Sequence, residues 1–350
     1  MPTQELRENK GFHPILERDH PYVFIDGCMQ AWPDADFANA HRHGATCYSV
    51  TAWRVHDDFE DAVEGLMFWH LVVRQNPNLR LALSAQDIVT AKETGGAALL
   101  MHAQGGEWIG AKLHRIEAMV RLGLRMMLPA YNRMNHICDG CLERSDNGLT
   151  AFGKQVVAEA NRLGLLLDGS HVGRRSTLEM IDLSSQPIVF SHSNVRALVD
   201  SPRNITDEQI LACTARGGVI GLAPFGPFCL KQGQTTWPTL SDFIDHVDYV
   251  VQLTGSTDTV GIGTDMSLGT YPYHTTDPWG EPDYVQVGKD YARHVCGDVR
   301  SPMRALADFN TYSQVWNLID ALAARGYDDQ QIGGFLGGNF LRVFGQVWPS

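Results

Sequence analysis

Two histidines close consecutive apolar runs near the middle of this 350-residue sequence. His171 ends Leu-Leu-Leu-Asp-Gly-Ser-His at 165–171, and His192 ends Ile-Val-Phe-Ser-His at 188–192. Each run has the length of a buried strand, so each histidine is expected where a strand meets its following loop. Neutral imidazole is the commonest protein ligand for zinc. The repeated Ser-His ending therefore predicts a metal site, although one such histidine alone would more often be a satisfied core residue.

A carboxylate occupies a similar place later in the chain. Asp265 closes Gly-Ile-Gly-Thr-Asp at 261–265, after another apolar run. In a parallel α/β barrel, the side chains at the carboxyl ends of the strands converge on one pocket. We therefore expect Asp265 to serve as a metal ligand or general base, with a loop N-cap or surface turn as the alternative.

The elements that would position these residues recur along the whole chain. Apolar runs of strand length alternate with amphipathic, helix-like segments, which predicts a parallel sheet covered by helices. Eight such runs occur, at 23–26, 45–51, 97–104, 125–131, 165–171, 188–192, 219–223 and 260–265. Eight units favour a (β/α)8 TIM barrel over an open sheet. We expect one domain over 1–350, ending in helices, with long connections at 132–149 and 268–300 that cover the site.

Composition excludes several classes of partner. The formal net charge of −12 argues against nucleic acid and anionic membrane surfaces, because both attract basic patches. No apolar run approaches the ~20 residues of a membrane span, and the polar N-terminus does not resemble a signal peptide. The seven scattered cysteines favour reduced thiols. These features predict a cytoplasmic protein with a small-molecule substrate.

Four segments of the sequence carry a family resemblance. GLTAFGKQVVAEANRLGLLLDGSHVG, PIVFSHSNVRAL, SPRNITDEQI and VGIGTDM resemble the renal or membrane dipeptidase family and its bacterial relatives. The resemblance extends from about residue 23 to 347. It implies a TIM barrel of the metallo-dependent hydrolase type, usually a homodimer, in which two zinc ions cleave dipeptides.

The resemblance also implies roles for individual residues. His171 and His192 match the two histidine ligands of the second ion. Asp265 matches the aspartate of the eighth strand that assists proton transfer. Arg203 matches the arginine that holds the carboxylate of the substrate.

The sequence departs from the family at the first ion. The family pattern Asp-Gly-His-x-Asp at the first strand reads Asp-Gly-Cys28-Met-Gln30 here, and the bridging glutamate is Gln104. Two neighbouring divalent cations repel each other and need carboxylates between them. We therefore expect a single ion held by His171, His192 and Asp265, with Cys28 as a further candidate ligand. Gln30, Gln104 and Tyr131, where the family often has histidine, would line the substrate site.

Three functions are compatible with this reduced site. The first is a dipeptidase-like hydrolase that acts on an amide or dipeptide-like substrate with a free carboxylate, using one divalent ion. Zinc suits the donor set, and non-haem iron is the alternative. The second is a non-peptidase enzyme of small amino-acid or N-methylated amine catabolism on the same barrel. The third is a non-catalytic binding protein, against which the joint presence of His171, His192, Asp265 and Arg203 speaks.

Overall fold

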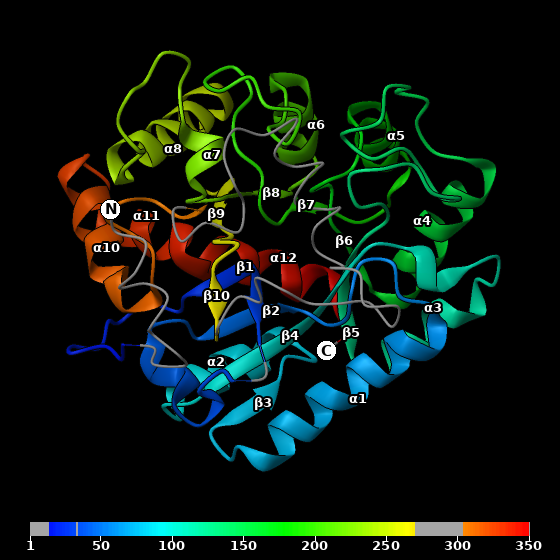
Figure 1. Cartoon of the computed structure of the whole chain (residues 1–350), viewed down its shortest axis with the longest axis horizontal. Coiled ribbons are helices and arrows are strands. Elements are labelled where there is room, and N and C mark those ends of the chain that lie inside the picture. Colours follow the sequence, from blue (N-terminus) through cyan, green and yellow to red (C-terminus); the bar gives the residue numbers. More distant parts are fainter. Residues whose placement is uncertain (1–13, 33, 270–303, 350) are drawn as a thin grey trace.

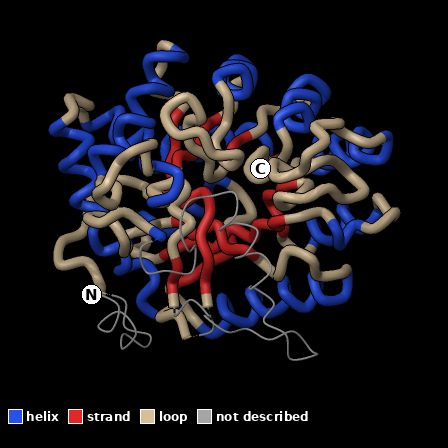
Figure 2. The backbone as a smooth tube through the Cα atoms, turned by 45° about the horizontal axis from the view of Figure 1, so that its top comes forward, coloured by secondary structure: helices blue, strands red, loops and turns tan. Residues whose placement is uncertain are grey.

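Eight parallel strands form a nearly closed barrel, with helices outside them (Figures 1 and 2). The structure is a computed structural model that describes residues 14–32, 34–269 and 304–349. The barrel strands, in spatial order, are β1 (Ile25–Ala31), β2 (Cys47–Thr51), β4 (Ala97–Gln104), β5 (Leu124–Leu128), β6 (Leu166–Leu167), β7 (Val189–Phe190), β8 (Val219–Leu222) and β9 (Val260–Ile262). Two short strands lie off this path, β3 (Leu79–Leu81) beside β4 and β10 (Ser267–Leu268) beside β1. The TIM barrel expected from the sequence is confirmed.

The helices follow their strands as the amphipathic segments predicted. They are α1 (Phe59–Gln75), α2 (Ala85–Glu93), α3 (His114–Arg121), α4 (Ala151–Leu163), α5 (Arg174–Leu183), α6 (Asp207–Ala215), α7 (Gly226–Cys229), α8 (Leu240–Thr254), α10 (Val315–Ala324), α11 (Asp329–Gly333) and α12 (Asn339–Val347). The N-termini of several of these helices are capped by side chains that satisfy free backbone amides. Thr150 accepts from Gly153 N before α4, and Thr206 forms a capping box with Gln209 before α6.

Two seams of the barrel share little backbone pairing. Between β1 and β9 the only register pair among the described residues is Asp26 with Ile262. Between β6 and β7 the described residues give a single bridge, from Asp168 to Val189. The other neighbouring barrel strands share at least two register pairs. An aspartate therefore lies at each of the two weakest seams.

These two aspartates accept hydrogen bonds in the same pattern. Asp26 Oδ1 accepts from Cys28 N (3.2 Å) and Thr264 N (2.7 Å), and its Oδ2 accepts from the Thr264 hydroxyl. Asp168 Oδ1 accepts from Ser170 N (2.8 Å) and Ser191 N (2.9 Å), and its Oδ2 accepts from the Ser191 hydroxyl. Each carboxylate thus joins its own strand to the chain that follows the neighbouring strand. Both are fully buried, where polar groups must be paired.

The two carboxylates differ in their further neighbours. Tyr312 donates to Asp26 at 2.7 Å, whereas His102 Nε2 lies 3.2 Å from Asp168 Oδ2. Burial raises the pKa of Asp26 to about 7, against the lowering effect of its hydrogen-bond donors. Burial also acts to raise the pKa of Asp168, but His102, His192 and Ser191 together hold that pKa below its ordinary value. His102 and the Ser191 hydroxyl, which lie against this carboxylate, therefore oppose the effect of burial at the second seam.

Helix α12 packs against the amino ends of the strands (Figure 1). Its Phe340 ring would lie within 3.0 Å of a Cβ built on Gly27 or Gly261. These strand positions must therefore be glycine for the ring to fit. Phe340 and Phe344 belong to a buried cluster with Ile25 of β1 and other strand residues, so this end of the barrel is packed core.

Several strands end earlier than the sequence predicts, because their backbone pairing with the neighbouring strand ends earlier. The run at 165–171 is strand only over β6, and the run at 260–265 is strand only over β9. His171 and Asp265 lie beyond those strands with positive φ angles of 63° and 51°, which is incompatible with extended backbone. In contrast, β1 extends to Ala31, so Cys28 and Gln30 lie within a strand.

The expectations about the second long connection, the domain organisation, the homodimer and the location are not tested by the structure. The connection at 268–300 lies outside the described residues, apart from its first two positions. Among the helices that the structure describes, none has the length and apolarity needed to cross a bilayer. The single-domain organisation, the homodimer and the cytoplasmic location stay predictions.

The pKa of Asp26 generates a prediction about stability. The pKa of Asp26 is near 4 in the unfolded protein and about 7 in the folded protein. Between these pH values only the folded protein keeps the proton on Asp26. The contribution of this group to the free energy of unfolding therefore decreases as pH rises from about 4 to about 7. At ~1.4 kcal/mol per pKa unit, the effect is at most about 4 kcal/mol. We expect Asp26→Asn to lack this slope in urea unfolding at pH 5 and pH 8. The matched Asp168→Asn variant should retain it. Equal slopes for Asp26→Asn and the unsubstituted protein would contradict the assignment.

Candidate metal and substrate site

The two predicted histidines face each other at the carboxyl ends of β6 and β7. Their Nε2 atoms are 2.9 Å apart, and both side chains are buried. His192 follows directly on Ser191, which the second seam holds in place. His171 is fixed by its left-handed backbone and by the amide of Cys141, which donates to its carbonyl at 2.8 Å. The first expectation from the sequence, that these side chains meet, is thus met by the geometry.

The outer ring nitrogens have acceptors that determine where the protons lie. Asn132 Oδ1 is 2.7 Å from His171 Nδ1, so it accepts the Nδ1 proton. Ser191 Oγ is 2.7 Å from His192 Nδ1 and gives its own single proton to Asp168, so it too accepts from the ring. Both Nε2 atoms are therefore left with lone pairs. The Tyr131 ring stacks on His171 with centroids 3.9 Å apart, which fixes the plane of that imidazole.

The two imidazoles are neutral in this environment. Burial, and then the charge of Arg203, lower the pKa of His171 and of His192 well below the ordinary value. Two lone pairs at this distance repel each other unless a cation lies between them. Tetrahedral zinc holds two ring nitrogens about 3.3 Å apart, given Zn–N bonds of ~2.0–2.1 Å. The pair therefore fits one metal ion after a small adjustment, and its Asn132 and Ser191 partners are the kind of outer contact that metal-binding histidines use.

Asp265 lies on the β1 side of the site. Its amide donates to Cys28 O at 2.8 Å, which aligns the chain after β9 with β1. Gln30 Nε2 donates to Asp265 Oδ1 at 3.2 Å, and Arg304 Nη2 lies 3.3 Å from the same oxygen. Burial raises the pKa of Asp265, although Arg304, Arg203 and Gln30 oppose this. A carboxyl with a raised pKa is suited to accept and return a proton near neutral pH.

Cys28 and Gln104 pair with each other rather than with the histidines. Gln104 Nε2 donates to Cys28 Sγ at 2.7 Å, and both side chains are buried. Burial, followed by the charges of Asp265, Asp168 and Asp26, raises the pKa of the Cys28 thiol well above its ordinary value. This environment favours the thiol over the thiolate that binds metals. The role of Cys28 as a ligand stays a prediction.

No complete ligand set is assembled by the described residues. Across 14–32, 34–269 and 304–349, no three His, Cys, Asp or Glu side chains are grouped closely enough to hold an ion. The structure brings His171 and His192 together, and it places Asp265 and Cys28 in contacts of their own. The residues present therefore fit one ion at the histidine pair and do not fit a second ion beside β1 and β4.

Arg203 lies next to His192, buried under the connection that follows β7. Its Nη2 donates to His192 O at 3.2 Å, and its guanidinium lies 5.2 Å from the Phe228 ring centroid. A pocket beside it is lined by His171, Cys141 and Ser193, among others. The guanidinium of Arg203 therefore lies beside this pocket and close to the histidines.

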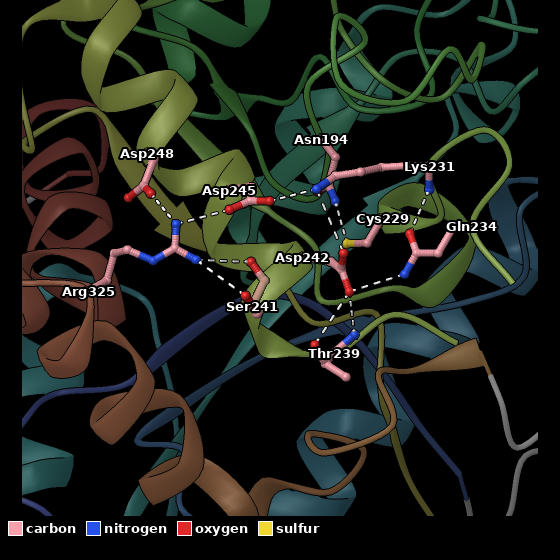
Figure 3. Close-up of polar contacts among 10 residues, drawn as sticks. All are labelled: Asn194, Cys229, Lys231, Gln234, Thr239, Ser241, Asp242, Asp245, Asp248 and Arg325. Carbon is pink, nitrogen blue, oxygen red and sulfur yellow. Dashed lines mark hydrogen bonds and ion pairs between the residues drawn. The ribbon is translucent and has the colours of Figure 1, made fainter. Parts of the chain in front are cut away.

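The connection that bears Phe228 is tied to α8. Lys231 Nζ donates to Asp245 Oδ2 at 2.6 Å, and Gln234 donates to Asp242 at 3.3 Å (Figure 3). Asn194, two positions after His192, donates to Cys229 Sγ at 3.3 Å from the opposite side (Figure 3). These contacts hold the chain after β8 against the chain after β7.

Sequence reasoning did not identify several residues of this site. They are His102, Asn132, Asp168, Ser191, Phe228 and Arg304. Asp168 could have been noticed as a charge inside the apolar run Leu-Leu-Leu-Asp-Gly-Ser-His. Arg304 could not be recognised from the sequence, because residues 266–303 separate it from Asp265.

Comparisons with known sequences identify the family of this chain. The profile described as membrane dipeptidase, peptidase family M19, matches residues 33–286. A Klebsiella pneumoniae protein described as an uncharacterized protein in the pqqA 5' region is 28% identical over 80% of this chain and 93% of its own length. Mouse dipeptidase 3 is 28% identical over 77% of this chain. The aligned region covers 48% of the mouse protein, so the chain spans about half of that relative.

Solved structures share the same barrel. An amidohydrolase from Pseudomonas aeruginosa superposes with a TM-score of 0.81 at 29% identity, covering 93% of this chain and 97% of that one. A metallo peptidase from Rhodobacter sphaeroides, liganded with a phosphinate mimic of the dipeptide L-Ala-D-Ala, superposes with a TM-score of 0.74. Its identity is 19% over 93% of this chain and 99% of that one, which establishes the fold alone. From the extent of the profile match, this chain belongs to the membrane dipeptidase family, peptidase family M19.

Proposed function

We propose that this protein is a dipeptidase-like hydrolase that uses one divalent metal ion per chain. The observation that carries the proposal is the facing pair of neutral Nε2 atoms on His171 and His192. Dipeptidase names among the relatives, and the dipeptide mimic in the Rhodobacter structure, support the same substrate class. The proposed substrate is a small amide with a free carboxylate.

Different residues of the site would bind the metal ion, transfer the proton and bind the substrate carboxylate. A divalent ion at the histidine pair would supply Lewis acidity to a carbonyl oxygen and acidify a water, with zinc as the expected metal and iron as the alternative. Asp265, whose pKa is raised by burial, would hold and return the proton. Arg203 would bind the substrate carboxylate through its guanidinium.

The walls of the site are neutral or aromatic. Tyr131, Gln104 and Gln30 stay candidate substrate contacts, because these uncharged side chains contact His171, Cys28 and Asp265 respectively. Tyr131 is already stacked on His171, so a substrate would meet its outer face.

The histidine pair gives the direct test of the proposal. We expect at most one transition metal per chain after exhaustive dialysis, measured by elemental analysis. His171→Ala and His192→Ala should each lose it, because removing one imidazole leaves a single nitrogen donor. His56→Ala, at an exposed position, is the control and should retain the metal. Two bound equivalents in the natural sequence, or full metal content in either site variant, would show that the ligand assignment is wrong.

The orienting role of Asn132 gives a second test. Asn132 has a φ of 62°, so Asn132→Gly keeps the backbone conformation while removing the acceptor for His171 Nδ1. We expect zinc affinity to fall by about 10- to 100-fold, as for other outer partners of metal ligands. Asn132→Asp retains an acceptor and should bind zinc at least as tightly as the natural sequence. Equal loss in both variants would indicate a structural effect instead.

The missing second ion limits the expected rate. Each ion of a two-metal site contributes several kcal/mol of charge stabilisation, so losing ~3–4 kcal/mol reduces the rate by roughly 10²- to 10³-fold. We expect slow hydrolysis of ordinary dipeptides relative to a two-metal family member. Residual activity should require the free carboxylate, so a C-terminally amidated dipeptide should react more slowly still. Brisk turnover of unmodified dipeptides would contradict the one-ion proposal.

A further inference from the structure

We propose that Arg304 replaces a second metal ion with a built-in positive charge beside Asp265. The inference rests on the proposed one-ion site and explains why the opposite side of the pocket does not take another ion. Arg304 follows the segment 270–303 and approaches the carboxyl ends of β1 and β9. Its guanidinium lies next to Asp265.

The contacts of Arg304 are those of a counter-ion. Its Nη2 lies 3.3 Å from Asp265 Oδ1 and also donates to the backbone carbonyl of Asp265. The two side chains are only 10% and 13% exposed, so solvent weakens this pairing little. A cation that approached Asp265 Oδ1 would meet a guanidinium already in place.

The neighbouring polar groups cannot offset a further positive charge. Gln30 gives its amide protons to the same carboxylate oxygen, and Gln104 gives its amide to Cys28. Amides and a buried thiol bring no negative charge to this side of the pocket. A divalent ion there would have Asp265 alone as its anionic donor, and Arg304 already neutralises that carboxylate.

The backbone around Arg304 is held in place. Ala305 forms an antiparallel bridge with Phe225, and Trp237 Nε1 donates to Ala305 O at 2.8 Å. The guanidinium lies 5.8 Å from the Phe225 ring centroid, within the range of a cation–π contact. The backbone contacts of Ala305 fix where the Arg304 side chain begins, and moving its guanidinium away from Asp265 would also give up the contact with Phe225.

The aromatic wall links the two arginines of the pocket. Arg203 contacts Phe228, Arg304 contacts Phe225, and the two phenyl rings are 4.7 Å apart. Each guanidinium group thus contacts one ring of the Phe225–Phe228 pair, which lies in the connection after β8. Arg203 is left for the substrate, while Arg304 is committed to Asp265.

The test adds potential metal ligands beside Asp265 and measures whether Arg304 still prevents a metal ion from binding there. The triple variant Cys28→His, Gln30→Asp and Gln104→Glu adds one imidazole and two carboxylates near Asp265. Elemental analysis after dialysis, with zinc titration calorimetry, counts the bound equivalents. We expect the triple variant to remain at no more than one zinc per chain. Adding Arg304→Met should raise the count by one equivalent.

Two further variants isolate the charge of Arg304. The triple variant with Arg304→Lys keeps a cation and should stay at the count of the triple variant alone. The triple variant with Arg196→Met removes an exposed arginine paired with Asp200, and it should also leave the count unchanged. If Arg304→Met prevents folding, as judged by the thermal midpoint, Arg304→Gln takes its place because it keeps a donor to the Asp265 carbonyl.

The outcomes separate this inference from the proposed function. A second zinc in the triple variant with Arg304 intact would overturn the role of Arg304. A folded Arg304→Met or Arg304→Gln combination that gains no zinc would overturn it as well. Metal binding at the histidine pair is tested separately by His171→Ala and His192→Ala. Even if that one-ion proposal fails, the zinc count of the triple variant can still be compared with and without Arg304→Met.

Discussion

A buried aspartate holds each of the two seams where the barrel strands share least backbone pairing. Asp26 joins β1 to the chain after β9, and Asp168 joins β6 to the chain after β7, each through two amides and one hydroxyl. Because a buried acceptor left without donors is costly, these bonds also fix the residues that provide them. Ser191 is one of those residues, and it directs the Nδ1 proton of His192. The same carboxylate therefore joins the strands at this seam and, through Ser191, sets the tautomer of His192.

The charge distribution of the pocket is uneven. On the β6 and β7 side, two neutral imidazoles present lone pairs to each other, with Arg203 lowering the pKa of both rings. On the β1 and β9 side, Asp265 is matched by Arg304 and surrounded by amides. One side is suited to receive a cation, while the other already contains one. In the proposed one-ion site, this division would avoid placing two divalent cations close together, where they would repel each other.

The sequence predicted those features that depend on local pattern. Apolar runs of strand length located all eight barrel strands, and the repeated Ser-His ending located His171 and His192, because alternation and spacing are recorded in consecutive residues. Strand ends were less accurate, since β6 and β9 stop where neighbour pairing stops and left-handed residues follow. Asn132 and Arg304 were not found, because each acts on a partner distant in sequence and sits in irregular chain. A pattern within one segment cannot show which remote side chain will complete a hydrogen bond.

The packing of Phe340 has a consequence for how the protein is made. The ring occupies space that Gly27 of β1 and Gly261 of β9 leave open, so both strands are synthesised before the helix that packs against them. At roughly 5–20 residues per second, tens of seconds separate synthesis of β1 from synthesis of α12. During that interval the amino end of the barrel lacks its apolar cover, and the first strands expose surface that attracts other chains. Until α12 has been synthesised, the space beside Gly27 and Gly261 stays unfilled, and the amino end of the barrel cannot complete its packed core.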